Sequence, residues 1–157
     1  SLPAAGSSPT ASSSSASEQP TSVIVRNIPT QCYLEDLVEA WRHSGEFDLL
    51  YLPRNAGGLK NLSYAFINFT SPSSAKRFIE LWHQRRMADV HAKKTLNATY
   101  ARIQGFAANI ANLKAIPVRQ FRTRQCFPYI AKWGRRLTLD DVDSSGRLAN
   151  RESALVT

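Results

Sequence analysis

The chain has 157 residues, 43% of them hydrophobic, which is enough for one domain with a real core. Its 20 lysines and arginines against 12 acidic residues give a net charge of +8, which favours a polyanionic partner such as nucleic acid. No apolar run is long enough for a membrane span or signal peptide. Two cysteines, Cys32 and Cys126, are too few for a disulfide framework or a zinc site. We expect reduced thiols, no cofactor and no membrane contact.

The first half of the chain is predicted to contain a polar N-terminal segment, then a strand, a helix and a second strand. Residues 1–21 are rich in Ser, Ala and Pro and are expected to be disordered, because they offer little apolar surface to bury. The β-branched run at 22–28 predicts a strand that ends before Pro29. Apolar residues then recur with helical spacing, at Leu34, Leu37, Val38 and Trp41. Residues 47–53 predict a second strand, closed by a proline.

A turn at 55–58 leads to a third predicted strand at 62–70. Ser71 followed by Pro72 is typical of a helix start, and apolar residues with helical spacing follow. Residues 96–102 predict a fourth strand, and a short helix is expected between Gly105 and Pro117. The order is β-α-β-β-α-β plus one helix. This predicts an α+β, ferredoxin-like fold, in which a four-stranded antiparallel sheet carries two helices on one face.

Side-chain alternation along the strands predicts which residues lie on the face that the helices leave open. On the third strand Tyr64 and Phe66 share this face, while Ala65, Ile67 and Phe69 point to the core. Leu96, Ala98 and Tyr100 are also assigned to the core. Exposed rings on a sheet suit base stacking in single-stranded nucleic acid, and neighbouring cations suit its phosphates. The candidate RNA-binding residues are Ile24, Arg26, Leu49, Tyr51, Lys60, Tyr64, Phe66, Asn68, Thr99, Arg102 and Gln104.

These residues resemble the two signature motifs of the RNA recognition motif. The octapeptide is Leu62-Ser63-Tyr64-Ala65-Phe66-Ile67-Asn68-Phe69, and the hexapeptide is Val23-Ile24-Val25-Arg26-Asn27-Ile28. Both depart from the common pattern. Leu62-Ser63 replaces the usual basic residue and glycine, and Ile24 stands where an aromatic residue usually stacks a base.

A narrower resemblance covers about residues 22–130. The segments Arg26-Asn27-Ile28-Pro29, Tyr100-Ala101-Arg102-Ile103-Gln104-Gly105 and Cys126-Phe127-Pro128 are similar to the C-terminal RNA recognition motif of the Mei-two-like family. That resemblance implies RNA binding with a non-aromatic hexapeptide position, a C-terminal extension that belongs to the domain, and a location in the nucleus or cytoplasm. We expect a monomer that binds single-stranded RNA, with a protein as a possible further partner.

Two other functions fit the same fold. The extra helix could cover the sheet, or the sheet could grip a peptide, which would make the chain a protein-interaction domain. An acyl phosphatase would need a phosphate-cradling loop, but Thr30-Gln31-Cys32-Tyr33 lacks the glycines for one. We therefore expect no enzymatic activity.

The C-terminal third carries two further signals beyond the predicted motif at 22–116. Between Gly105 and Arg136 there are seven basic residues and no acidic one, with aromatic residues interleaved, and we define 117–136 as a basic-aromatic extension that suits RNA. Residues 137–157 are expected to be a flexible acidic tail. It contains a weak match to an EF-hand calcium loop, with candidate ligands Asp141, Asp143, Ser145 and Glu152.

Overall fold

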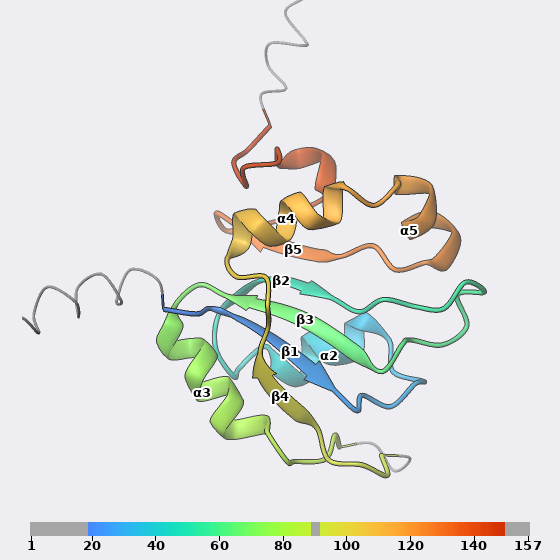
Figure 1. The fold of residues 1–157 in the computed structure, drawn as a ribbon, viewed down its shortest axis with the longest axis vertical. Coiled ribbons are helices and arrows are strands. Elements are labelled where there is room, and N and C mark those ends of the chain that lie inside the picture. The colour runs from blue at the N-terminus through green and yellow to red at the C-terminus, as the bar shows by residue number, and fades with distance from the viewer. Residues whose placement is uncertain (1–18, 89–91, 150–157) are drawn as a thin grey trace, which may run out of the picture.

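A computed structural model describes residues 19–88 and 92–149, which form one antiparallel sheet with helices packed on both of its faces (Figure 1). The elements, in chain order, are β1 (Ser22–Arg26), α2 (Leu34–Trp41), β2 (Phe47–Tyr51), β3 (Tyr64–Phe69), α3 (Pro72–Trp82), β4 (Asn97–Tyr100), α4 (Phe106–Lys114), α5 (Val118–Arg124), β5 (Tyr129–Lys132), β6 (Arg135–Leu137) and the 3-10 helix η1 (Leu139–Asp141). The predicted β-α-β-β-α-β order and the following helix are confirmed. None of the described helices has the length and apolar character needed to cross a membrane.

Local sequence signals place the first two helices. At the start of α2, the Asp36 carboxylate accepts a 2.8 Å hydrogen bond from the backbone N–H of Tyr33. At the start of α3, the Ser71 hydroxyl accepts from the backbone N–H of Ser74, and Pro72 takes the first helical position, where no N–H is needed. Both helix starts therefore depend on short-range hydrogen bonds made by residues that can be identified in the sequence.

The sheet is larger than predicted. Its strand order is β4-β1-β3-β2-β5-β6, so the expected four strands are extended beyond β2 by a hairpin of the C-terminal segment. β5 pairs with β2, with Leu49 opposite Ile130 and Leu50 opposite Tyr129. The prediction of a four-stranded sheet is therefore wrong in its count, because β2 is not an edge strand.

The main core lies between the sheet and helices α2 and α3. Val23, Val25 and Ile67 from the strands are buried against Trp41 and Phe78 from the helices. Leu96 and Ala98 join this core as predicted, but Tyr100 does not and is 44% exposed. Tyr100 pairs with core-facing Val23, yet it lies on the edge strand β4, where the helices do not cover it.

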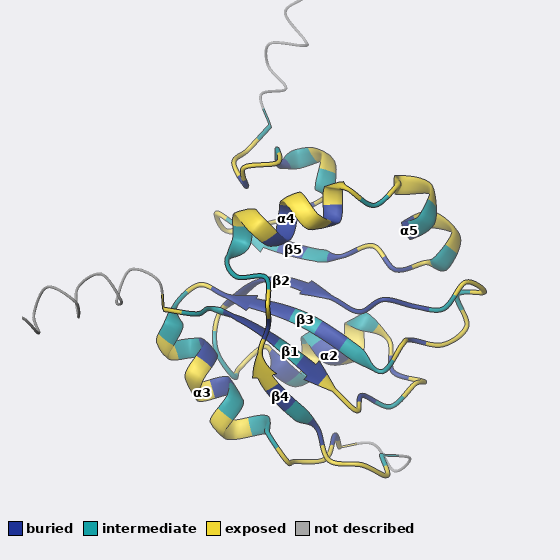
Figure 2. Ribbon diagram, viewed as in Figure 1, coloured by how far each residue is buried: buried dark blue, intermediate teal, exposed yellow. Residues whose placement is uncertain are grey.

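A second core lies on the opposite face, over β2 and β5. Ile110 and Leu113 of α4, Phe121 of α5, and Leu137 and Val142 of the C-terminal segment are all buried there. Figure 2 shows α4 with exposed residues on its outer side. The expectation of a flexible tail from residue 137 is thus wrong for 137–149, which pack as part of the domain.

The calcium-loop match does not have the surroundings of an EF-hand in the described residues. Strand β6 and the short η1 precede it instead of an entering helix, and Val142 bridges to Leu148 within the loop. The Asp143 carboxylate accepts hydrogen bonds from Ser145 and Arg147 of its own turn, and these bonds lower its pKa. Glu152, the expected bidentate ligand, lies outside the described residues, as do residues 1–18.

Candidate nucleic-acid interface

A strip of the sheet face opposite α2 and α3 remains uncovered, and we call it the open strip. Strand register arranges it in two rows. In the first row Ile24 of β1 lies between Phe66 of β3 and Thr99 of β4. In the second row Arg26 lies between Tyr64 and Asn97. We define the open strip as these six residues: Ile24, Arg26, Tyr64, Phe66, Asn97 and Thr99.

The two aromatic rings of the open strip are only partly accessible. Tyr64 and Phe66 are both half-buried, and their ring centroids lie 5.6 Å apart with an interplanar angle of 82°. This edge-to-face arrangement is a favourable one for two aromatic rings. Because the planes are nearly perpendicular, the two rings present differently oriented surfaces to a ligand. Phe66 also packs against the second core, which fixes its position from one side.

Two residues expected on the open face lie beneath the C-terminal segment. Leu49 and Tyr51 point to the predicted side of β2, but they are only 1% and 8% exposed. Tyr51 packs edge-to-face on Phe121, with ring centroids 5.8 Å apart. Their proposed contact with RNA is therefore contradicted by burial, because α4 and α5 occupy the space above β2. The alternative in which an additional helix covers the sheet therefore holds for this half of the face.

Burial also affects the Tyr51 phenol. Desolvation is the main cause that raises the pKa of Tyr51 well above its usual value, with the neighbouring Cys126 thiol as a further cause. The neutral phenol is therefore the form favoured by folding. The stability that this burial contributes is complete below the ordinary tyrosine pKa and is lost as the pH rises above it.

When the folded protein is brought to about pH 11, we expect the rise in phenolate absorbance to be the same for Tyr51→Phe as for wild type, because Tyr51 does not ionise there. In denaturant the same substitution will remove one of the chain's 5 tyrosines from the titration, and this serves as the control. Absorbance at alkaline pH measures both states. If the folded variant already lacks part of the absorbance step near pH 10, then Tyr51 is accessible to water.

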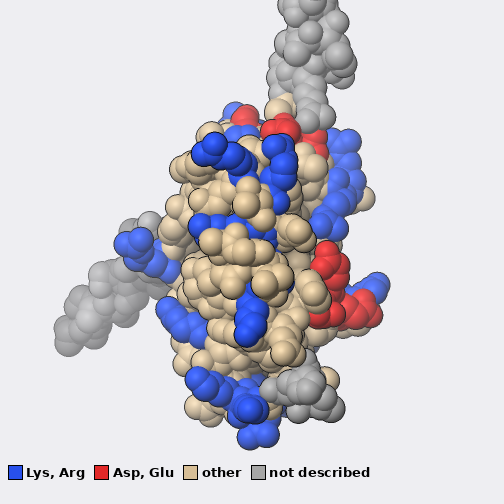
Figure 3. Space-filling model, turned by 90° about the vertical axis from the view of Figure 1, so that its right-hand side faces the viewer, with Lys and Arg blue, Asp and Glu red and all other residues tan. Residues whose placement is uncertain are grey.

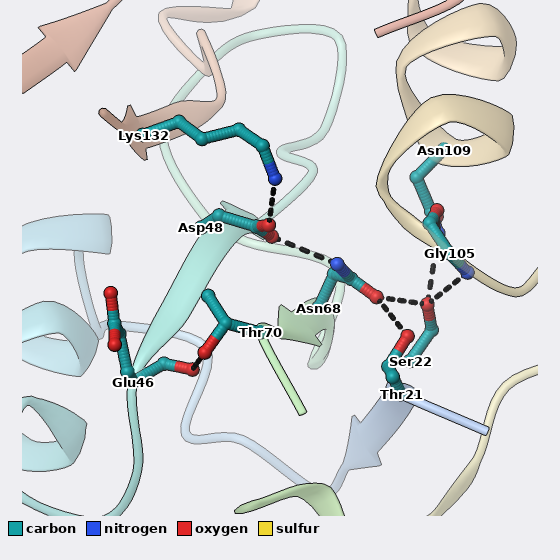
Figure 4. A network of polar contacts seen from close by, with 9 residues as sticks. All are labelled: Thr21, Ser22, Glu46, Asp48, Asn68, Thr70, Gly105, Asn109 and Lys132. Carbon is teal, nitrogen blue, oxygen red and sulfur yellow. Dashed lines mark hydrogen bonds and ion pairs between the residues drawn. The ribbon is translucent and has the colours of Figure 1, made fainter. Parts of the chain in front are cut away.

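Asn68, another candidate contact, belongs to a buried polar network (Figure 4). Its side-chain oxygen accepts hydrogen bonds from the hydroxyls of Thr21 and Ser22, each 2.7 Å long. Its side-chain nitrogen donates to Asp48, whose other carboxylate oxygen accepts from Lys132 of β5 at 2.9 Å. Asn68 therefore links β1, β2 and β5, and its donors and acceptors are not available to RNA.

The same network holds the beginning of α4. The Asn109 side chain donates to the Ser22 hydroxyl at 3.0 Å, and the backbone N–H of Gly105 donates to the same oxygen. Asp48 reaches this face because it is the extra residue at an irregularity in the pairing of β2 with β3, between Phe47 and Leu49. A bulge that sequence alternation does not reveal therefore supplies the carboxylate.

Gln104 is likewise engaged within the chain. Its side-chain oxygen accepts from the backbone N–H groups of Thr21 and Ser22, and its nitrogen donates to the carbonyls of Ser22 and Ala101. These four bonds fasten the segment after β4 to the start of β1. The structure thus contradicts an RNA contact through the Gln104 amide.

The remaining candidates are accessible. Arg26, Lys60, Thr99 and Arg102 are exposed, and Ile24 is half-buried. No member of the open strip is acidic, and Asp48 beneath the neighbouring segment is neutralised by Lys132. This part of the face therefore combines two aromatic rings and an aliphatic contact with uncompensated positive charge.

Sequence reasoning missed the side wall of the open strip. A crevice of about 60 Å³ opens beside Phe66, and Ile103, Asn112 and Leu113 contribute to its lining. Asn112 is exposed on α4 at this crevice. The helical pattern predicted α4 but not its position across the sheet, so no sequence signal pointed to these residues.

Comparison with known proteins agrees with this geometry. The profile of the family described as RNA recognition motif 2 matches residues 20–114. Protein MEI2-like 3 of Arabidopsis thaliana is 32% identical over 112 residues, which cover 70% of this chain and 15% of that protein. Protein terminal ear1 homolog of Oryza sativa subsp. indica is 30% identical over 123 residues, covering 66% of this chain and 18% of that protein. The chain thus spans less than a fifth of these relatives.

Among solved structures, the Rna15 RRM with bound RNA (GU) is similar, with a TM-score of 0.50 and 15% sequence identity. The match covers 60% of this chain and 97% of that chain. At this identity the likeness bears on the fold alone, and it confirms the predicted fold class. The similarity to MEI2-like proteins confirms the narrower resemblance drawn from the sequence.

Proposed function

This chain belongs to the RNA recognition motif 2 family, and from that membership we propose that its open strip binds single-stranded RNA. The observation that carries the proposal is the pairing of Tyr64 with Arg26 across β3 and β1 on an uncovered face. An aromatic ring offers a stacking surface to any base, and the adjacent guanidinium can pair with a phosphate or stack in turn. The binding would involve no chemical step.

The geometry favours a short, single-stranded contact. Ile24 and Phe66 lie side by side as an apolar floor, and α4 closes the β2 side of the strip. Bases must be unpaired to lay their faces on such a floor, because in a duplex those faces are already stacked on one another. Exposed Arg26 and Arg102 supply positive charge for the backbone, which positions a strand without reading its sequence.

A second candidate function is protein interaction, in which the strip grips a peptide. The coverage of Leu49 and Tyr51 by the C-terminal segment favours it, because that coverage leaves a smaller aromatic surface than a fully open sheet would offer. Charge argues for RNA as the main ligand, since the strip is cationic and lacks acidic residues. We further propose that the chain acts as a monomer, and the sequence resemblance favours a location in the nucleus or cytoplasm.

We expect Tyr64→Ala to weaken binding of a randomised single-stranded RNA pool by about 1–3 kcal/mol, because a stacking surface is lost. Tyr64→Phe keeps the ring and should bind nearly as wild type. Tyr64 is a cleaner target than Phe66, which also supports the second core. Fluorescence anisotropy at two salt concentrations, with circular dichroism to verify folding, measures the effect.

If Arg26 pairs with one phosphate, Arg26→Ala should weaken RNA binding and reduce the slope of log affinity against log salt concentration by about 0.7. Lys76→Ala on α3 provides the control, because it removes the same charge from an exposed position on the opposite side of the sheet.

The proposal would be wrong if Tyr64→Ala bound the RNA pool as tightly as wild type while remaining folded.

A further inference from the structure

A second hollowed surface lies between α5, the β5–β6 hairpin and the start of α2, and none of its lining residues belongs to the open strip. It consists of two hollows of about 460 and 370 Å³ that share Arg122, Phe127 and Arg136 in their linings. Each falls within the range of about 300–1,000 Å³ that is usual for ligand sites. We call the joined hollows the Phe127 groove. The three shared residues lie in the basic-aromatic extension, which the sequence predicts to suit RNA without indicating individual site residues.

One face of the Phe127 ring packs on the protein, and the rest of the ring is exposed. The residue is 49% exposed, and its packed side lies on the ring of fully buried Phe121, with centroids 5.8 Å apart and an interplanar angle of 33°. Before it, Gln125 ends α5 in the left-handed conformation, with φ 53°, and turns the chain toward β5. A half-exposed ring held on a rigid support is the arrangement on which a nucleobase stacks at low entropic cost.

Two arginines line both hollows together with this ring. Arg122 of α5 and Arg136 of β6 are exposed, and within the described residues neither forms an ion pair with a carboxylate. The Arg136 guanidinium lies 4.1 Å from the ring centroid of Tyr129, which orients it over the hairpin. Glu35 and Asp140 each line only one of the hollows, whereas both arginines line the two. The shared centre of the groove is therefore positive.

The second core links the Phe127 groove to the β2 side of the sheet, because the buried Phe121 ring packs against both Phe127 and Tyr51. Arg124 is close enough to Tyr51 for its charge to act on that phenol, although burial dominates the raised pKa of Tyr51. The loop between β2 and β3 rests on the end of α5, since a Cβ at Gly58 would lie 3.2 Å from the Arg124 carbonyl oxygen. In Figure 3, which faces the right-hand side of Figure 1, groups of Lys and Arg side chains occur from top to bottom, and Asp and Glu side chains gather at the top and on the right.

We propose that the Phe127 groove is a second contact site for the same single-stranded RNA, holding nucleotides beyond those on the open strip. This inference rests on the proposed function. A base stacks on Phe127, and Arg122 and Arg136 neutralise the neighbouring phosphates. Charge favours an anionic ligand, because seven basic residues and no acidic one occur from Gly105 to Arg136. The exposed Phe127 ring favours RNA over an acidic peptide, because each nucleotide brings both a phosphate and a base that can stack.

The test compares a short oligonucleotide of about four nucleotides, which the strip alone can hold, with one of about twelve. In the full chain, Phe127→Leu keeps apolar packing on Phe121 but removes the stacking face. We expect about tenfold weaker binding of the longer RNA and unchanged binding of the shorter one. Phe127→Tyr retains a ring and should bind both as wild type does. Unchanged affinity for the short RNA also shows that the variant is folded.

The arginines are tested by charge-matched variants. Arg122→Ala with Arg136→Ala should lower the salt slope for the longer RNA by about 1.4, or about 0.7 for each phosphate contact. Lys76→Ala with Arg77→Ala removes the same charge from exposed positions on α3 and should leave that slope nearly unchanged.

The inference is overturned if Phe127→Leu binds the longer RNA as wild type does while Tyr64→Ala weakens both RNAs, and the proposed function then stands. It is also overturned if Phe127→Leu affects only the binding of an acidic test peptide containing phenylalanine, which would assign the groove to a protein ligand. If Tyr64→Ala leaves both RNAs unaffected, the proposed function fails as well.

Discussion

Replacing Phe121 with alanine should lower the free energy of unfolding of the C-terminal segment by about 3–5 kcal/mol. Phe121 is fully buried at the centre of the second core, between the rings of Tyr51 and Phe127. Its removal leaves a cavity that two aromatic neighbours and the buried Ile130 cannot readily fill. Leucine at the same position keeps part of the volume and should cause a smaller loss.

Amide hydrogen exchange can show where this loss falls. Protection should decrease most in α4, α5 and the β5–β6 hairpin, and less in β1 and β3, because Val23 and Ile67 belong to the separate core under α2 and α3. An equal loss of protection in both regions would show that the two cores unfold as one cooperative unit. Stability unchanged from wild type would contradict the assigned packing of Phe121.

Asp48→Ala should have the next largest effect, lowering the free energy of unfolding by about 2–4 kcal/mol. The Asp48 side chain is 3% exposed, and its loss leaves both the Lys132 ammonium and the Asn68 amide without their acceptor. Lys132 is 29% exposed and also lies 4.1 Å from the Phe106 ring centroid. Water and that ring therefore offset part of the free energy lost when the ammonium has no carboxylate partner.

Asp48→Asn is the matched control for this change. It keeps an acceptor oxygen for Asn68 but replaces the oxygen that accepts from Lys132 with an amide group that donates, so denaturant unfolding should place it between wild type and Asp48→Ala. The double variant Asp48→Ala with Lys132→Met should be less destabilised than the sum of its single changes, because no unpaired charge is left. Strict additivity would show that the 2.9 Å ion pair does not couple β2 to β5.

Alternation and helical spacing predicted the fold because each depends on residues close in the chain. Ser71 and Pro72 mark the start of α3, and the alternation around Tyr64 and Phe66 assigns β3 and its two faces. These sequence patterns are clear because one side of each helix and strand is buried, so apolar residues recur with the period of that element. The same reasoning assigned Leu49 and Tyr51 to the correct face of β2.

The accessibility of that face could not be predicted in the same way. Tyr51 is covered by Phe121, a residue far along the chain, and the contact depends on how α5 returns to the sheet. Asn68 and Gln104 have polar side chains that suit RNA equally well, but their hydrogen bonds are made to Ser22, Thr21 and Asp48. A polar side chain on a strand does not by itself indicate whether its partner is RNA or the protein.

The octapeptide and its neighbours determined by themselves that this chain forms an α+β sheet domain with Tyr64, Phe66 and Arg26 on one face, because strand periodicity is a local property. Tertiary structure decided that β5 and β6 extend the sheet, that α4 and α5 cover its β2 side, and that Phe127 is left exposed in a groove that two arginines also line. These features arise from contacts between residues distant in the chain, which close only when the second core buries its apolar side chains together.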